Sequence, residues 1–181
     1  MLSHRLRLLL RHLAALLLLA MPGAFGLAQV SSESQLKAAF LVNFLKYVEW
    51  PASNATTANI CLFGRDTLGA TLGAYEGRSV AGRELRVHRI TGPDQAAQCQ
   101  ILFIPDTEEA RFGVVLRWVE NQPTLTVSDA EVFTRVGGAI ALVRLEGRLQ
   151  FDVNMEALNR QGLKPHSQMM RLAHHVIGMP K

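Results

Sequence analysis

The chain has 181 residues, about the length of one domain, and 49% of them are apolar, which is ample for a hydrophobic core. The formal net charge is +4, but three of the 19 basic residues lie in the first 11 positions, where no acidic residue occurs. The rest of the chain therefore has 16 basic and 15 acidic residues. This balance provides no basic surface for nucleic acid, and we expect no nucleic-acid partner.

The first 28 residues have the pattern of a secretory signal peptide. A basic segment is followed by an apolar run at residues 13–21, and Gly26-Leu27-Ala28 supplies small residues where a signal peptidase cuts. The run is about half the length of a membrane-spanning helix. We predict cleavage after Ala28 and a mature domain of residues 29–181 in the periplasm. There, cysteines oxidise and we expect no soluble nucleotide cofactor.

A long helix is expected at the start of the mature chain. Ser32 and Gln35 have the spacing of a capping box, which predicts a helix over residues 36–48 that ends before Trp50-Pro51. The helix is apolar almost all round, apart from one narrow polar stripe. Such a helix is either buried in its own domain or covered by a partner, and burial in the domain is the simpler interpretation.

The middle of the chain alternates between strand and helix patterns. We predict strands at residues 59–63, 84–90, 101–104 and 124–127, helices at residues 68–75 and 106–120, a hairpin at residues 139–153, and helices at residues 154–162 and 168–177. The continuous apolar run at residues 101–104 is typical of a central parallel strand. The predicted fold is a single three-layer α/β domain, with a mostly parallel sheet, an antiparallel edge hairpin and helices on both faces.

Two cysteines remain in the mature chain, Cys61 and Cys99. In an exported protein an even number of cysteines favours a disulfide, and here only one pairing exists. The alternative is a pair of buried free thiols that behave as small apolar side chains. In a doubly wound sheet of order 2-1-3, residues 59–63 and 101–104 form neighbouring strands, so the two cysteines would lie within bridging distance.

Several near-motifs of enzymes are incomplete. The loop at residues 64–69 follows a strand as a phosphate loop does, but it lacks the lysine. The segment at residues 77–81 lacks the second glycine of a nucleophile elbow. The histidines at positions 88, 166, 174 and 175 do not have metal-ligand spacing. We therefore expect a protein that is not an enzyme and holds no metal or cofactor.

Ser128 and Asp129 are candidate ligand contacts. They follow the predicted strand at residues 124–127, and open α/β sheets bind ligands at the carboxyl ends of their strands. The simpler interpretation is that Asp129 caps a short helix at residues 130–134.

The C-terminal segment is another candidate binding surface. Met169, Met170 and Leu172, together with apolar residues further along, are too many for one narrow helical stripe. We predict that some of them contact a partner or a second copy of the chain, since methionine adapts well to such contacts. Complete burial in the core is the alternative.

Several of these segments resemble the signatures of the YfiR-like periplasmic proteins. The matching stretches are residues 36–44 with 48–51, 60–64, 99–104, 125–129, 151–154, 162–164 and 167–173. They span nearly the whole mature chain in the same order. Cys61 and Cys99 match one cysteine pair of the family, and a second pair known in the family has no counterpart here.

The resemblance implies a regulatory role. Proteins of this family include repressors that bind the periplasmic sensor region of an inner-membrane diguanylate cyclase and lower cyclic di-GMP and biofilm output. It further implies an outer-membrane lipoprotein that sequesters the repressor, and a homodimer. Phe151, Met169, Met170 and Leu172 are then the expected partner contacts. The alternative function is small-ligand binding in a crevice near Ser128 and Asp129.

Overall fold

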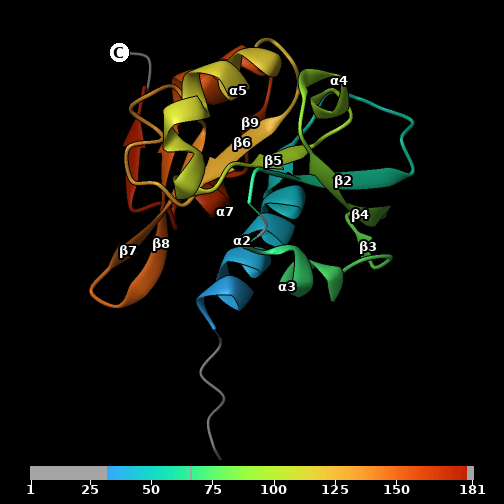
Figure 1. Ribbon diagram of the computed structural model, residues 1–181, viewed down its shortest axis with the longest axis horizontal. Helices are drawn as coiled ribbons and strands as arrows, with labels where there is room; N and C mark the ends of the chain where they lie inside the picture. Colours follow the sequence, from blue (N-terminus) through green and yellow to red (C-terminus); the bar gives the residue numbers. More distant parts are fainter. Residues whose placement is uncertain (1–31, 66, 179–181) are drawn as a thin grey trace, which may run out of the picture. The chain divides into compact units, whose positions relative to one another are not determined.

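The described residues, 32–65 and 67–178, are arranged around an eight-stranded sheet in this computed structural model (Figure 1). From one edge to the other the strands are β3 (Ser79–Val80), β4 (Arg83–Ile90), β2 (Thr57–Phe63), β5 (Ile101–Phe103), β6 (Leu125–Ser128), β7 (Ile140–Leu145), β8 (Arg148–Asn154) and β10 (His175–Ile177). The five strands from β4 to β7 are parallel, whereas β3 pairs with β4 and β8 pairs with β7 antiparallel. The predicted parallel sheet, its 2-1-3 strand order and its hairpin are confirmed. The predicted signal peptide lies outside the described residues.

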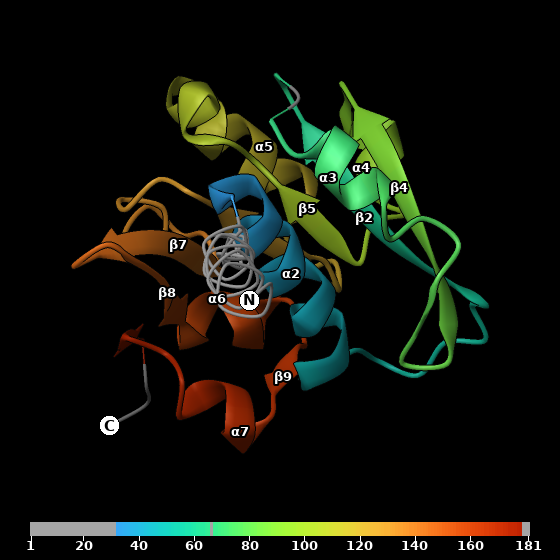
Figure 2. The same ribbon diagram turned by 90° about the horizontal axis from the view of Figure 1, so that it is seen from below.

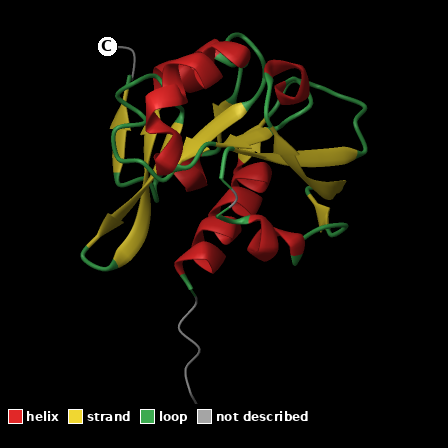
Figure 3. Ribbon diagram, in the orientation of Figure 1, coloured by secondary structure: helices red, strands yellow, loops and turns green. Residues whose placement is uncertain are grey.

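Helices cover both faces of this sheet, as Figure 3 shows. They are α2 (Glu33–Tyr47), α3 (Gly69–Gly73), α4 (Pro93–Ala96), the 3-10 helix η1 (Asp106–Arg111), α5 (Phe112–Trp118), α6 (Met155–Arg160) and α7 (Ser167–Met170). One core cluster holds α2, α3, α6 and α7, and the other holds α4 and α5. Alternate residues of β2 point to opposite clusters, since Ile60 belongs to the first and Cys61 to the second. The predicted three-layer arrangement is therefore confirmed.

Helix α2 begins as the sequence predicts. The Ser32 hydroxyl accepts a hydrogen bond from the Gln35 backbone N–H (3.2 Å), and the Gln35 side-chain oxygen accepts one from the Ser32 N–H (2.7 Å). Five residues of the helix are buried in the first core cluster: Ala38, Leu41, Val42, Phe44 and Leu45. Burial within the domain is thus confirmed for this face. The helix ends at Tyr47 because Val48 leaves it to pair with Pro165, in the small sheet of β1 (Val48–Glu49) and β9 (Lys164–Pro165).

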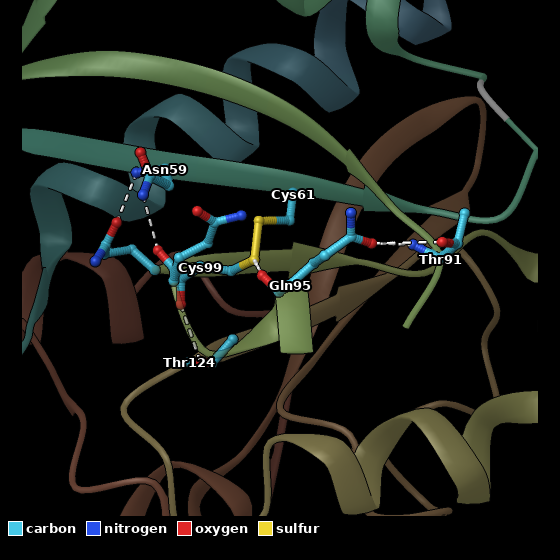
Figure 4. Close-up of a disulfide and its surroundings, with 8 residues drawn as sticks. Asn59, Cys61, Thr91, Gln95, Cys99 and Thr124 are labelled. Atoms are coloured by element: carbon cyan, nitrogen blue, oxygen red, sulfur yellow. Dashed lines mark hydrogen bonds between the residues drawn. A yellow bond between two sulfur atoms is a disulfide. The ribbon is translucent and has the colours of Figure 1, made fainter. Parts of the chain in front are cut away.

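The predicted disulfide is present. Cys61 lies in β2 and Cys99 two residues before β5, and these two strands are neighbours (Figure 4). The two Cα atoms are 5.8 Å apart, within the range of a disulfide. Both cysteines are buried in the second core cluster. The Thr124 hydroxyl donates to the Cys99 carbonyl oxygen (2.9 Å), so β6 is held to the same point. The bridge therefore ties two neighbouring central strands where the second begins.

The predicted C-terminal helix is wrong in its second half. Helix α7 ends at Met170, and β10 then runs parallel to β8, with Val176 opposite Val153. Two physical reasons favour a strand: β-branched side chains fit a sheet well, and the outer edge of the hairpin offers unpaired backbone groups. The His174 N–H donates to the Phe151 carbonyl oxygen (2.9 Å), and this hydrogen bond joins the residue before β10 to β8.

The predicted helix at residues 106–120 is also interrupted. Its first part is the 3-10 helix η1, and Glu108 has φ −103° and ψ 16°, outside the helical region. Asp106 does not cap it, since the N-cap is Pro105 and no side chain binds there. The apolar spacing identified the α5 half correctly, because only that half packs on the sheet through Phe112 and Val115.

Removing the disulfide should destabilise the fold strongly. The closed loop spans 38 positions, so the chain-entropy model predicts that the Cys61→Ala/Cys99→Ala variant loses about 3 to 4 kcal/mol of unfolding free energy. Urea denaturation of the double variant and the oxidised parent measures this loss. A variant within about 1 kcal/mol of the parent would contradict a structural role for the bridge.

Candidate functional site

An apolar groove lies between helices α2 and α7, and we call it the α2–α7 groove. It has a volume of about 380 Å³ and is lined by Phe40, Asn43, Phe44, Tyr47, Phe151, Gln168, Met169 and Leu172. Two backbone contacts join the end of α2 to the segment before α7. Val48 pairs with Pro165, and the His166 N–H donates to the Tyr47 carbonyl oxygen (2.8 Å). Figure 2 shows α7 following β9 at the end of α2. The groove thus depends on how α2 ends.

The floor of the groove is a triad of aromatic rings. Phe40 and Phe44 stand one turn apart on α2, with ring centroids 5.9 Å apart. Phe151, from β8, contacts both edge-on, at 5.7 Å and 5.4 Å. These edge-to-face contacts are favourable beyond the area they bury, so they stabilise the floor of the groove.

The rim of the groove exposes apolar side chains. Leu172 is 74% exposed and Tyr47 is 37% exposed, whereas Met169 beneath them is only 3% exposed. Asn43 and Gln168 contribute amide groups to the lining, and none of the charged side chains that the structure describes lines the groove. Such a surface can accept a nonpolar side chain from a partner, while the two amides can bind the adjoining peptide groups.

Three of the four residues predicted as partner contacts line this one groove: Phe151, Met169 and Leu172. Met170 does not line it, and packs partly buried against the first core cluster. The sequence prediction missed Phe40, Phe44 and Tyr47 on α2. Their three- and four-residue spacing was the available signal, but a helix apolar on most of its circumference gives no indication of which apolar stripe remains accessible.

Asp129 holds three segments together. Its Oδ2 accepts a hydrogen bond from Lys37 Nζ on α2 (2.6 Å), and its Oδ1 accepts one from the Asp106 backbone N–H (2.8 Å). Ser128 is fully buried, and its hydroxyl oxygen accepts from the Ala130 N–H (3.1 Å). Because both carboxylate oxygens are bound by the protein itself, a ligand would have to compete with these contacts.

Asp129 does not have the predicted capping role. The segment at residues 131–137 forms turns and contains no helix, so the carboxylate has no helix to cap there. Its partners, Lys37 and Asp106, come from segments far away in sequence. Only the folded sheet brings them together.

The pair formed by Lys37 and Asp129 is mostly buried, with 15% and 10% of the side chains exposed. Burial alone lowers the pKa of Lys37, but hydrogen bonds to Asp129 and Glu33 outweigh it and raise the pKa above its ordinary value. The hydrogen bond from Lys37, with the charges of Lys37 and Arg144, lowers the pKa of Glu33 from its ordinary value. Both ion pairs of Glu33 measure 2.8 Å. The lysine is therefore charged at neutral pH.

Two further findings concern the part of the chain that the structure describes. No group of three or more histidine, cysteine, aspartate or glutamate side chains there could hold a metal ion. Within the same residues, no helix is long and apolar enough to cross a bilayer. Two of the histidines contact carboxylates: His166 Nε2 lies 3.1 Å from Glu49, and His174 Nδ1 lies 2.9 Å from Asp152.

Comparison with known proteins identifies a family and relates the fold to solved structures. Residues 34–174 match the model of the YfiR/HmsC-like family. An ABC domain in complex with L-Trp from Streptococcus pneumonia is 12% identical, with a TM-score of 0.53 over 77% of this chain and 60% of that one. A conserved domain protein from Vibrio cholerae is 10% identical, with a TM-score of 0.53 over 80% of this chain and 60% of that one. These two likenesses concern the fold alone.

Replacing Asp129 should destabilise the protein without any ligand being involved. We expect Asp129→Ala to lose about 1 to 3 kcal/mol of unfolding free energy, because it leaves the mostly buried Lys37 charge with Glu33 as its remaining partner. Urea denaturation measures the loss. An unchanged unfolding free energy would show that the contacts of Asp129 contribute nothing.

The contribution of Lys37 should depend on pH in one direction. Because its pKa is raised in the folded state, its stabilising effect is fully present below the unfolded pKa and is lost as the pH rises through the folded pKa. The difference in unfolding free energy between the parent and Lys37→Met should therefore stay constant up to about pH 10 and shrink at higher pH. Lys46→Met, which removes an exposed lysine from the same helix, is the matched control for the loss of a lysine side chain. A difference for Lys37→Met that stays constant above about pH 10 would contradict the pairing.

Proposed function

The chain belongs to the YfiR/HmsC-like family, and we propose that it is a periplasmic regulator that represses an inner-membrane diguanylate cyclase. In this proposal the protein binds the periplasmic sensor region of the cyclase and lowers cyclic di-GMP, and with it biofilm and exopolysaccharide output. It acts by binding and not by catalysis. The observation that carries the proposal is the α2–α7 groove, a preformed apolar site on a domain of this family.

The shape of the groove favours a protein segment as its occupant. An aromatic floor below exposed apolar side chains is the arrangement found at binding hot spots, where one anchoring side chain enters a dry pocket. The described residues that line the groove include no charged side chain, so we expect the anchor to be an apolar side chain of the sensor region. The amides of Asn43 and Gln168 would then bind the backbone beside it.

Exposure of Leu172 supports the same interpretation. Single exposed apolar residues are common, but this one borders a pocket already lined by aromatic rings. A side chain 74% exposed at that position can contribute to binding without contributing much to folding. It can therefore be changed without loss of the fold.

Two other occupants are consistent with the family and would appear as outcomes of the test. One is an outer-membrane lipoprotein that sequesters the repressor, and the other is a second copy of the chain in a homodimer. The ligand-binding alternative at Ser128 and Asp129 is less favoured, because Asp129 already binds Lys37 and Asp106 through both oxygens.

The groove is tested by Leu172→Glu in the native host. We expect this variant to bind the sensor region at least about tenfold more weakly, because burying a new carboxylate in an uncharged groove is unfavourable, and to raise cyclic di-GMP. Binding is measured by calorimetry with the purified sensor region, and cyclic di-GMP by mass spectrometry of cell extracts. Leu172→Glu is a sharper test than Met169→Glu, because Met169 is buried and its replacement would also disturb the core.

Val114→Glu is the matched control. Val114 is 45% exposed on α5 and belongs to neither wall of the groove. We expect its binding and cyclic di-GMP to match the parent. The proposal is wrong if Leu172→Glu is exported and melts normally but leaves both readouts unchanged. Retained cyclase binding with loss of lipoprotein binding or of dimers would assign the groove to one of those occupants instead.

A further inference from the structure

We propose that the α2–α7 groove selects a protein segment that carries an acidic residue beside its apolar anchor. Two cations flank the groove, Lys46 in the last turn of α2 and Arg171 at the end of α7. They add a charge requirement to a groove whose own lining is apolar. The inference rests on the proposed function only in taking a protein segment as the occupant.

Basic charge is concentrated in the segment that forms one wall of the groove. Residues 157–181 contain four lysines and arginines, three histidines and no acidic residue, whereas residues 29–156 have 12 basic and 15 acidic residues. Gln168, Met169 and Leu172 of this C-terminal segment line the groove. The wall therefore comes from the basic part of a chain that is otherwise slightly acidic.

Each amide that lines the groove has a cation one helical turn further along. Asn43 and Lys46 are three residues apart on α2. Gln168 and Arg171 have the same spacing on α7, whose backbone is still helical at Arg171 (φ −68°, ψ −19°). Residues three apart are neighbours on a helix surface. The two cations thus lie beside the two walls, next to the amides that can bind the backbone of a partner.

The charges of Lys46 and Arg171 are exposed and unmatched. Neither side chain forms an ion pair with any residue that the structure describes. Glu49, the acidic residue that follows α2, lies 3.1 Å from His166 Nε2 and opposite Lys164 in the β1–β9 pair. Its carboxylate already has these neighbours, so the two cations are available to a partner.

Charge complementarity then specifies the occupant. An aspartate or glutamate next to the anchor would pair with Lys46 or Arg171 at the rim, whereas a lysine or arginine there would be repelled. An anionic membrane surface would match the charge as well, but it has no peptide backbone for the amides of Asn43 and Gln168. A protein segment with an apolar side chain and a neighbouring carboxylate satisfies both features of the groove.

A peptide selection tests this requirement without assuming the natural partner. The exported protein selects from a displayed library of random peptides of about 12 residues. We expect enrichment of an aromatic or aliphatic residue together with Asp or Glu. Selection on Lys46→Gln/Arg171→Gln should keep the apolar residue and lose the acidic excess, and Leu172→Glu should lose both. Arg135→Gln/Arg148→Gln, which removes two exposed arginines outside the groove lining, is the matched control and should keep both.

The salt dependence of binding provides a second measurement. With the purified sensor region of the cyclase, we expect the parent to bind about three- to tenfold more weakly in about 500 mM than in about 50 mM NaCl. Lys46→Gln/Arg171→Gln should bind about three- to tenfold more weakly than the parent at the lower salt, and should show little of this salt dependence. Its melting temperature should match that of the parent, because both residues are exposed and unpaired.

This inference and the proposed function fail in different ways. If the sensor region does not bind but the selected peptides keep their acidic excess, the inference stands and the cyclase assignment is wrong. If the sensor region binds the parent and Lys46→Gln/Arg171→Gln alike at both salt concentrations, and the peptides show no acidic excess, the inference is overturned and the cyclase assignment stands.

Two further outcomes would overturn the inference. One is a selection that enriches no peptide. The other is binding of the parent, but not of Lys46→Gln/Arg171→Gln, to vesicles of phosphatidylethanolamine with about one quarter phosphatidylglycerol. That result would assign the two cations to a membrane surface.

Discussion

The packing of helix α2 against one face of the parallel sheet is the interaction on which the rest of the structure depends. Ala38 and Leu41 of this helix are completely buried in the first core cluster, which extends across the central strands. The same helix provides Phe40 and Phe44 for the floor of the α2–α7 groove. Its end, at Tyr47, passes directly into the strand pair that positions α7. One helix therefore completes the core and builds the candidate partner site.

Two tethers of different chemistry hold the sheet and this helix in place. The disulfide acts within the sheet, where it joins β2 to the start of β5 and is buried from solvent. The contact of Lys37 with Asp129 acts between layers, since it joins α2 to the end of β6 and to the loop after β5. The disulfide lowers the conformational entropy of the unfolded chain. The contact of Lys37 with Asp129 contributes to stability only while both side chains are charged. Reducing agents and high pH would thus weaken different parts of the fold.

The sequence by itself determined the elements whose signals are local. The capping box of α2, the apolar run of β5 and the spacing of the two cysteines correctly predicted a helix start, a central strand and a bridge between neighbouring strands. The helix start and the central strand were predicted correctly because capping and burial preferences are properties of the local side chains. The bridge was predicted correctly because connections between parallel strands follow fixed rules of handedness and order.

Tertiary structure alone decided the remaining features. Residues 175–177 are a strand because the edge of β8 was available to pair with them, which no local pattern records. Asp129 binds Lys37, 92 positions away, and not the turn that follows it. Which stripe of α2 stays open likewise depends on contacts between segments distant in sequence. The physical reason is the same in each case: the free energy that fixes these residues comes from long-range packing and pairing, and the local sequence contributes little to it.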